Sequence, residues 1–392
     1  MDAPATPKRP WYQRKREYVE LADRYVLGMN LAAASNDPLT VAEVKSLHAY
    51  SLVKLIFESN RLESAGLSEG ETKKLIDQFS RIKVQSDGTL VETGPGPAVQ
   101  EAVAAGRVVP RVVFEGKSRP EREVLQHLNA LEMVLDAGKA YDKAVTTGAV
   151  PPALVSEAWI KQLHQTLAAG LLPADSEVPA GEYRVDDRRI EGVDLKLPAP
   201  ELLAPMMTEL VKRTHARVAA WRAQCDQAMA RVDQVWTQTA VAAAMHGDVT
   251  SAERLQVVKA LMEVMSSRWE LAAWVSYEFA CIHPFPDFNG RVSRLLLALL
   301  LWVLGVPMWV SLLGDAKGKH RYLTALKHAN RGKLDAYTAL IAKSVVDAGQ
   351  QVDANLARAG LPSLLSLVDT KAAELVKALP GAGRTGQKGE AG

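Results

Sequence analysis

The stretch Cys281–Arg294, which reads C-I-H-P-F-P-D-F-N-G-R-V-S-R, sets the strongest limits on how this chain can fold. Two prolines, Pro284 and Pro286, remove backbone donors and fix φ, so the segment His283–Phe288 is predicted to be a loop. A charge-free run, Leu295–Leu313, follows at once. The sequence therefore predicts a polar loop that ends on the first turn of an apolar helix.

Several polar residues gather where the loop meets this helix. Asn289 is a favourable helix N-cap, and Gly290 lets a ligand or another backbone come close. The first N–H groups of a helix have no partner within the helix and favour an anion. Arg291 and Arg294 are three residues apart, so both reach the same side of the first turn. Together these groups suit a di- or triphosphate.

The loop itself carries two further reactive groups. Asp287 can hold a Mg²⁺ ion that bridges phosphates, because carboxylate oxygens are typical ligands of this ion. His283, at the other end of the loop, is the natural general base for a hydroxyl nucleophile. A buried loop with a satisfied histidine and two surface arginines explains each residue singly. It does not explain the whole set in this order.

These residues resemble the signature of Fic-domain proteins, HxFx(D/E)GNGRxxR. The segment His283–Arg294 matches every fixed position except Phe288, which stands where the family has glycine. The resemblance implies an all-α fold, with a Fic-type helical bundle, a small β-hairpin flap and an N-terminal helical subdomain. It also implies transfer of AMP from Mg²⁺-ATP to a Ser, Thr or Tyr hydroxyl of a target protein.

The resemblance assigns a role to each residue of the signature. His283 would deprotonate the target hydroxyl, Phe285 would anchor the loop in the core, and Asp287 would bind Mg²⁺. The phosphate-binding residues would be Asn289 and Gly290, which line the turn, and Arg291 and Arg294, which contact the β- and γ-phosphates.

Phe288 is the departure from the family pattern. A glycine there allows φ > 0, whereas a bulky residue in that conformation costs on the order of 1–3 kcal/mol. Three functions therefore stay open. The chain is an active nucleotidyltransferase, or it uses an altered donor for phosphoryl or phosphocholine transfer, or it is a non-catalytic binding protein because Phe288 fills the phosphate-binding turn.

A second segment resembles the inhibitory helix that some Fic proteins carry N-terminally. A helix is expected from Thr40, an N-cap candidate, to about Phe57, and its end continues into Glu58-Ser-Asn-Arg-Leu-Glu63. The family pattern, S/T-xxx-E-(G/N), predicts that Glu58 lies against Arg294 and occupies it. Lys54 departs from the pattern at the Ser/Thr position, and Ser59-xxx-Glu63-Ser64 is a second, weaker register.

The segment Ala180–Pro200 predicts a β-hairpin, because it is short, β-prone and bounded by turn residues. It is similar to the flap of Fic proteins, which pairs through its backbone with the target protein. Tyr183, Arg184 and Ile190 are the expected target-binding residues. An alternative for Arg184 is a structural ion pair.

Composition bounds the remaining possibilities. The chain has 392 residues, 48% hydrophobic content and a net charge of only +2, so it has ample material for a core and no general attraction to nucleic acid. Two cysteines make no disulfide framework, and no zinc-binding motif occurs. Gly305 and Pro307 split the apolar run, which favours a buried helix over a membrane span.

We therefore expect a cytoplasmic protein that binds a nucleotide and a target protein, and neither membrane nor nucleic acid; a homodimer stays open. The predicted organisation is an N-terminal helical region with the inhibitory-type helix and an irregular insertion at 85–117, then a Fic core and a C-terminal helix with a polar tail. The three parts are residues 1–117, 118–350 and 351–392.

Overall fold

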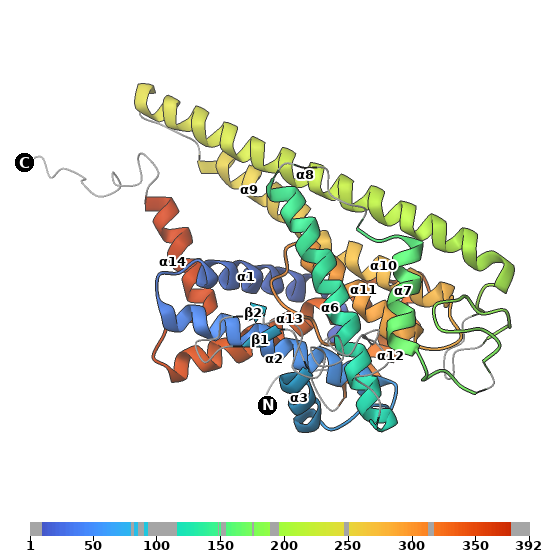
Figure 1. Cartoon of the computed structure of the whole chain (residues 1–392). Coiled ribbons are helices and arrows are strands. Elements are labelled where there is room, and N and C mark those ends of the chain that lie inside the picture. The colour runs from blue at the N-terminus through green and yellow to red at the C-terminus, as the bar shows by residue number, and fades with distance from the viewer. Residues whose placement is uncertain are drawn as a thin grey trace, which may run out of the picture.

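The computed structural model describes residues 10–79, 82–84, 90–92, 116–147, 149, 154–174, 176–188, 196–246, 251–312 and 317–377. The predicted all-α fold is confirmed (Figure 1). Two three-residue strands, β1 (Ile82–Val84) and β2 (Leu90–Glu92), pair antiparallel with Ile82 opposite Glu92. The second strand falls in the irregular insertion expected at 85–117, and residues 93–115 of that insertion lie outside the described residues.

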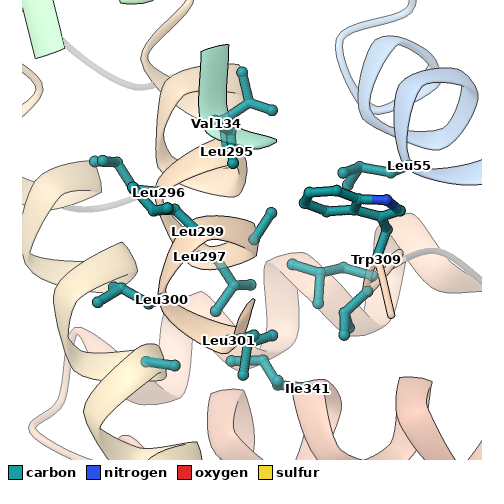
Figure 2. Close-up of a cluster of buried hydrophobic side chains, with 14 of the residues drawn as sticks. Leu55, Val134, Leu295, Leu296, Leu297, Leu299, Leu300, Leu301, Trp309 and Ile341 are labelled. Atoms are coloured by element: carbon teal, nitrogen blue, oxygen red, sulfur yellow. The ribbon is translucent and has the colours of Figure 1, made fainter. Parts of the chain in front are cut away.

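The apolar run after the loop forms the central helix α11 (Asn289–Val303). Leucines cover all sides of this helix, so it is buried all round, as its composition predicts. α10 (Arg268–Ile282) and α6 (Arg119–Thr146) pack directly on it. Figure 2 shows Leu295–Leu301 surrounded by side chains of other elements, among them Leu55, Trp309 and Ile341. Across the described segments, no helix combines the length and the apolar character that a membrane crossing needs.

The N-terminal helices and the C-terminal helices form one layer. The short 3-10 helix η1 (Trp11–Gln13) leads into α1 (Lys15–Ala33), which packs along α13 (Asp335–Arg358) and α14 (Leu364–Lys377) (Figure 1). A buried ion pair joins this layer to α10, because Arg268 Nη2 lies 2.8 Å from Asp23 Oδ1.

α2 (Pro38–Leu62) lies between this layer and the core, against α1, α6 and α13. Asp37, not Thr40, is its N-cap, because the Asp37 carboxylate accepts the Thr40 N–H at 2.9 Å and Pro38 occupies the first turn. The helix continues to Leu62 and turns into α3 (Glu69–Phe79). Its C-terminal end thereby reaches the N-terminus of α11.

The remaining helices complete the frame around the loop. α7 (Glu157–Ala168) packs on α6. The 3-10 helix η2 (Pro200–Leu202) precedes α8 (Leu203–His246), a single long helix that runs beside α9 (Ser251–Ser266) (Figure 1). α12 (Gly318–Ala329) packs on α13 and closes the side of the molecule next to the loop.

Candidate functional site

The predicted loop lies between α10 and α11, with both of its ends in the left-handed region. His283 ends α10 with φ 50° and ψ 55°, and Phe288 precedes α11 with φ 62° and ψ 3°. Asn289 is the first residue of α11 and not its N-cap. Its side chain instead accepts the Phe285 N–H at 3.0 Å and donates to the Phe285 carbonyl at 2.7 Å. Asn289 therefore holds the loop in shape, while the fully buried Phe285 anchors it in the core.

The loop forms one wall of a cavity of about 650 Å³. This volume lies in the range of small-molecule binding sites. α10 and α12 contribute aromatic and apolar side chains, α2 contributes a carboxylate, and the loop and α11 contribute polar groups. The lining includes Tyr277, His283, Asp287, Gly290, Arg294, Glu63, Lys319, Tyr322, Leu326 and Asn330.

His283 lines this cavity with one ring nitrogen already engaged. Its Nδ1 lies 3.3 Å from the Ala280 carbonyl, which can only accept, so Nδ1 carries the proton and Nε2 is the basic nitrogen. Burial lowers the pKa of His283 to about 4; the Arg184 charge adds to this, and the hydrogen bond to Ala280 opposes it. The imidazole is thus neutral at physiological pH, as a general base must be.

Arg294 is buried and bound by the end of α2. Its Nε donates to the Ser59 hydroxyl at 2.8 Å, and its Nη2 donates to the Ser59 carbonyl at 3.0 Å and to Glu63 Oε1 at 2.7 Å. The Glu63 carboxylate also covers the turn, since a Cβ on Gly290 would lie 2.5 Å from Glu63 Oε1. Burial raises the pKa of Glu63, but Arg294 outweighs it and holds this pKa below its usual range.

The predicted partner of Arg294, Glu58, is not the residue that the structure places there. Glu58 is buried beside Lys54 and Arg61, at 3.8 and 3.7 Å. Five positions separate Glu58 from Glu63, which is roughly 140° around a helix, so the two carboxylates face different sides of α2. The second register, Ser59-xxx-Glu63-Ser64, is therefore the one that meets the arginine.

Arg291 departs from its predicted role as a phosphate ligand. Its guanidinium carbon lies 4.0 Å from the centre of the Phe288 ring, and its Nη1 donates to Asn60 Oδ1 at 3.4 Å. Only 5% of Arg291 is exposed, and it does not line the cavity. An aromatic face attracts a guanidinium, which explains why the ring of Phe288 and the amide of Asn60 hold Arg291 away from the cavity.

Asp287 is exposed and lines the cavity, and its Oδ1 accepts the Phe288 N–H at 2.6 Å. No cluster of three or more His, Cys, Asp or Glu side chains suited to a metal occurs in the described part of the chain. The single carboxylate of Asp287 suits Mg²⁺, because Mg²⁺ is usually bound by one or two carboxylates together with substrate phosphates.

The segment predicted to be a β-hairpin flap forms no strand in its described parts, 180–188 and 196–200. Ile190 lies outside the described residues. Arg184 is 1% exposed and serves the loop: its N–H donates to Pro284 O at 2.9 Å and its Nε to His283 O at 2.9 Å. The other guanidinium nitrogens bind the Asp186 and Pro198 carbonyls, both at 2.6 Å, so Arg184 is structural and not exposed to a target protein.

The centre of the Tyr183 ring lies 5.5 Å from that of the Phe285 ring. The ammonium nitrogen of Lys161 lies 4.4 Å from the centre of the Tyr183 ring. This tyrosine is half-buried and so supports the loop as well. Tyr183 and Arg184 thus contact the loop and support its shape. The predicted contact with a target protein stays a prediction.

His164 of α7 ties the flap segment to the loop, a role that the sequence did not indicate. Its Nδ1 accepts the Gly181 N–H at 2.9 Å, its Nε2 lies 3.2 Å from the Asp287 carbonyl, and its ring stacks on Phe285 at 3.8 Å. These partners require the neutral ring, with the proton on Nε2. Burial lowers the pKa of His164 to about 4, which maintains that form.

We expect His164→Gln to release the flap segment selectively. Glutamine can place a donor near the former Nε2 but leaves the Gly181 N–H without its acceptor. The Gly181 amide should then exchange with deuterium roughly tenfold faster, since a lost hydrogen bond costs about 1.4 kcal/mol. Hydrogen exchange followed by mass spectrometry measures this rate, with His320→Gln as an exposed histidine control. Unchanged exchange at Gly181 would contradict the assigned contact.

Comparison with known proteins agrees with this arrangement. Residues 154–301 match the model of the Fic/DOC family. A Fido domain-containing protein of Dictyostelium discoideum is 38% identical over 80 residues, which is 19% of this chain and 54% of that protein. A protein adenylyltransferase Fic of Aedes aegypti is 38% identical over 71 residues, which is 18% of this chain and 14% of that protein. The chain thus matches about half the length of the first relative and a smaller share of the second.

Solved structures show the same fold. Fic-1 from C. elegans is 18% identical, with a TM-score of 0.50 over 89% of this chain and 73% of that one. At this identity the likeness concerns the fold alone. The matched region of the family model includes the flap segment, the whole loop and all of α11 except its last two residues.

Proposed function

This chain is a Fic-domain protein, and we propose that it transfers AMP from Mg²⁺-ATP to a Ser, Thr or Tyr hydroxyl of a target protein. The observation that carries the proposal is the shared cavity: His283 and Arg294 both line it, at the N-terminus of a helix and beside an exposed carboxylate. A base, a cation and a helix N-terminus in one cavity suit the transfer of a phosphate group.

In this proposal, each residue has a defined task. His283 Nε2 takes the proton of the target hydroxyl as its oxygen forms a bond to the α-phosphorus, and the bond from that phosphorus to the leaving pyrophosphate breaks. Arg294 and the first N–H groups of α11 stabilise the charge on the leaving phosphates. Asp287 would hold Mg²⁺, which neutralises phosphate charge when bound. Tyr277, Leu326 and Asn330 line the cavity and offer an apolar and hydrogen-bonding surface for the adenine ring of ATP.

The enzyme as described would be inhibited by its own α2. Glu63 binds Arg294 and covers Gly290, where a donor phosphate would lie. A carboxylate and a phosphate compete for the same guanidinium. The proposed activity therefore requires that Glu63 move, and release of this contact is the regulated step.

One observation favours a second candidate. Phe288 keeps φ 62° despite its bulk and contacts Arg291, so Arg294 is the one arginine of the signature that lines the cavity. Donors with fewer phosphate charges would then serve, in phosphoryl or phosphocholine transfer. Intact-mass analysis of the Glu63→Gly variant, in which the proposed inhibition is absent, and of candidate targets, after incubation with Mg²⁺ and each donor, separates these reactions. A mass increase of one AMP supports the first proposal, and no increase with any donor rejects both.

The pKa of His283 predicts an unusual pH dependence. The base is active when neutral, and its pKa of about 4 lies below the ordinary value of 6.5, so lowering the pH from 7 to 5 leaves it deprotonated. We expect the transfer rate of Glu63→Gly to stay nearly constant from pH 7 to about 5 and to fall tenfold per pH unit below about 4. A rate profile measured with labelled ATP checks this. A midpoint near 6.5 would contradict the buried neutral imidazole.

A further inference from the structure

We propose that Lys319, together with Arg294, binds the donor phosphates in place of Arg291. This inference rests on the proposed function and identifies which cationic side chains bind the phosphates of the donor nucleotide. It departs from the expectation that the two arginines at the start of α11 act as a pair.

The first step is the position of Arg291. Its guanidinium is stacked on the Phe288 ring at 4.0 Å and is hydrogen-bonded to Asn60 Oδ1 at 3.4 Å. The same Asn60 oxygen lies 3.3 Å from His127 Nδ1, so Asn60 joins Arg291 to α6. To reach a phosphate, Arg291 would have to leave both the ring and the amide. These contacts make Arg291 part of the packing behind the cavity.

The second step is the position of Lys319. It lies in the first turn of α12, is exposed, and lines the cavity opposite the start of α11. Arg294 lines the cavity from α11, as does Glu63 from the end of α2. The charges of Arg294, Arg291 and Lys319, in that order, lower the pKa of Glu63, but only Arg294 and Lys319 of these three line the cavity. When Glu63 moves away, Lys319 and Arg294 are left facing the space that its carboxylate occupied.

The third step is chemical. A lysine ammonium binds phosphate as a compact point charge on a flexible stem, whereas an arginine binds it through a planar fork. A site with one arginine and one lysine therefore still recognises two phosphate charges. Lysine imposes less geometry on the bound phosphate than an arginine at the same place would.

The test uses calorimetry on the full chain with Glu63→Gly as the background. Adenosine, AMP, ADP and ATP are titrated with Mg²⁺, so that each added phosphate gives its own gain in affinity. Adding Lys319→Ala should weaken ATP binding roughly tenfold and leave adenosine binding unchanged. Lys319→Arg should restore most of the loss. Lys327→Ala, an exposed lysine on the same helix that does not line the cavity, should change nothing.

The outcomes separate this inference from the proposed function. One result would overturn the inference and leave the proposed function standing. In it, Glu63→Gly binds ATP, adding Lys319→Ala does not change that affinity, and adding Arg291→Lys reduces the gain in affinity that each added phosphate gives. Arg291 would then be the phosphate ligand. If Glu63→Gly binds none of the four ligands, both are rejected. Arg291→Lys keeps the charge and the packing stem, and a thermal melt confirms that the variant is folded.

Discussion

Replacing His283 with alanine should lower the rate of AMP transfer by about 10²–10⁴-fold, the usual contribution of a positioned general base. His283 lines the cavity and its Nδ1 is held by the Ala280 carbonyl at 3.3 Å, which leaves Nε2 as the nitrogen that can accept the proton of a hydroxyl. The rate is measured with labelled ATP in the Glu63→Gly background, where the proposed inhibition is absent. ATP affinity should change little, because the imidazole acts on the target hydroxyl and not on the phosphates.

Two controls make this result specific. His283→Gln keeps a side chain of similar reach without a base at this position, and should be as inactive as alanine. His320→Ala removes an exposed histidine that does not line the cavity, and should be fully active. If His283→Ala kept activity within threefold of its parent, another group would have to accept the proton and the proposed mechanism would be wrong.

The loop could be predicted from sequence because local rules determine it. The prolines and the apolar run placed the boundaries of His283–Phe288, and in the structure α10 ends at Ile282 and α11 begins at Asn289, directly on either side of this loop. The interpretation of Asn289 as an N-cap was wrong. A short amide satisfies either an exposed helix N–H or the loop backbone, and the fold uses it for Phe285 because that loop residue is buried and needs partners.

The partner of Arg294 could not be chosen from sequence, since the choice depends on how α2 is docked. Both Glu58 and Glu63 follow a polar or charged residue four positions earlier, and only the rotation of α2 against α6 and α11 selects between them. A local signal did exist. Ser59 can bind the same guanidinium as Glu63, whereas Lys54, at the equivalent position before Glu58, would repel it.

Residues distant in sequence account for the rest. His164 lies 123 positions before the Asp287 carbonyl that it contacts, and a histidine within an amphipathic helix gives no sign of such a partner. Lys319 follows the apolar helix in a polar stretch, and its sequence neighbours give no sign that it lines the cavity. That Arg291 does not line the cavity could be anticipated only in part. Phe288 is visible in the sequence as a departure from the signature. The contacts of Arg291 with the Phe288 ring and with Asn60 depend on the tertiary structure.

Replacing Glu63 with glycine should raise the rate of AMP transfer by roughly 10–100-fold. A charge-assisted hydrogen bond contributes about 1.5–3 kcal/mol, and the contact between Arg294 Nη2 and Glu63 Oε1 at 2.7 Å must be broken before a phosphate can use that nitrogen. Arg294 stays in place without Glu63, because Ser59 still binds its Nε and Nη2. Glu63 is the C-cap of α2 and lies outside the helix interior, so glycine there does not carry the cost of glycine within a helix.

Glu58→Gly is the matched control, since it removes a carboxylate from the same helix without touching the cavity. It should leave the rate unchanged and lower the free energy of unfolding by about 1 kcal/mol or more, because glycine disfavours a helix interior and the contacts with Lys54 and Arg61 are lost. Both variants are compared by labelled-ATP assay, calorimetry with ATP and thermal melting. Activation by Glu58→Gly with none by Glu63→Gly would show that α2 inhibits in the other register. Activation by neither, with ATP bound equally by all three proteins, would mean that the Glu63–Arg294 contact does not restrain the donor site.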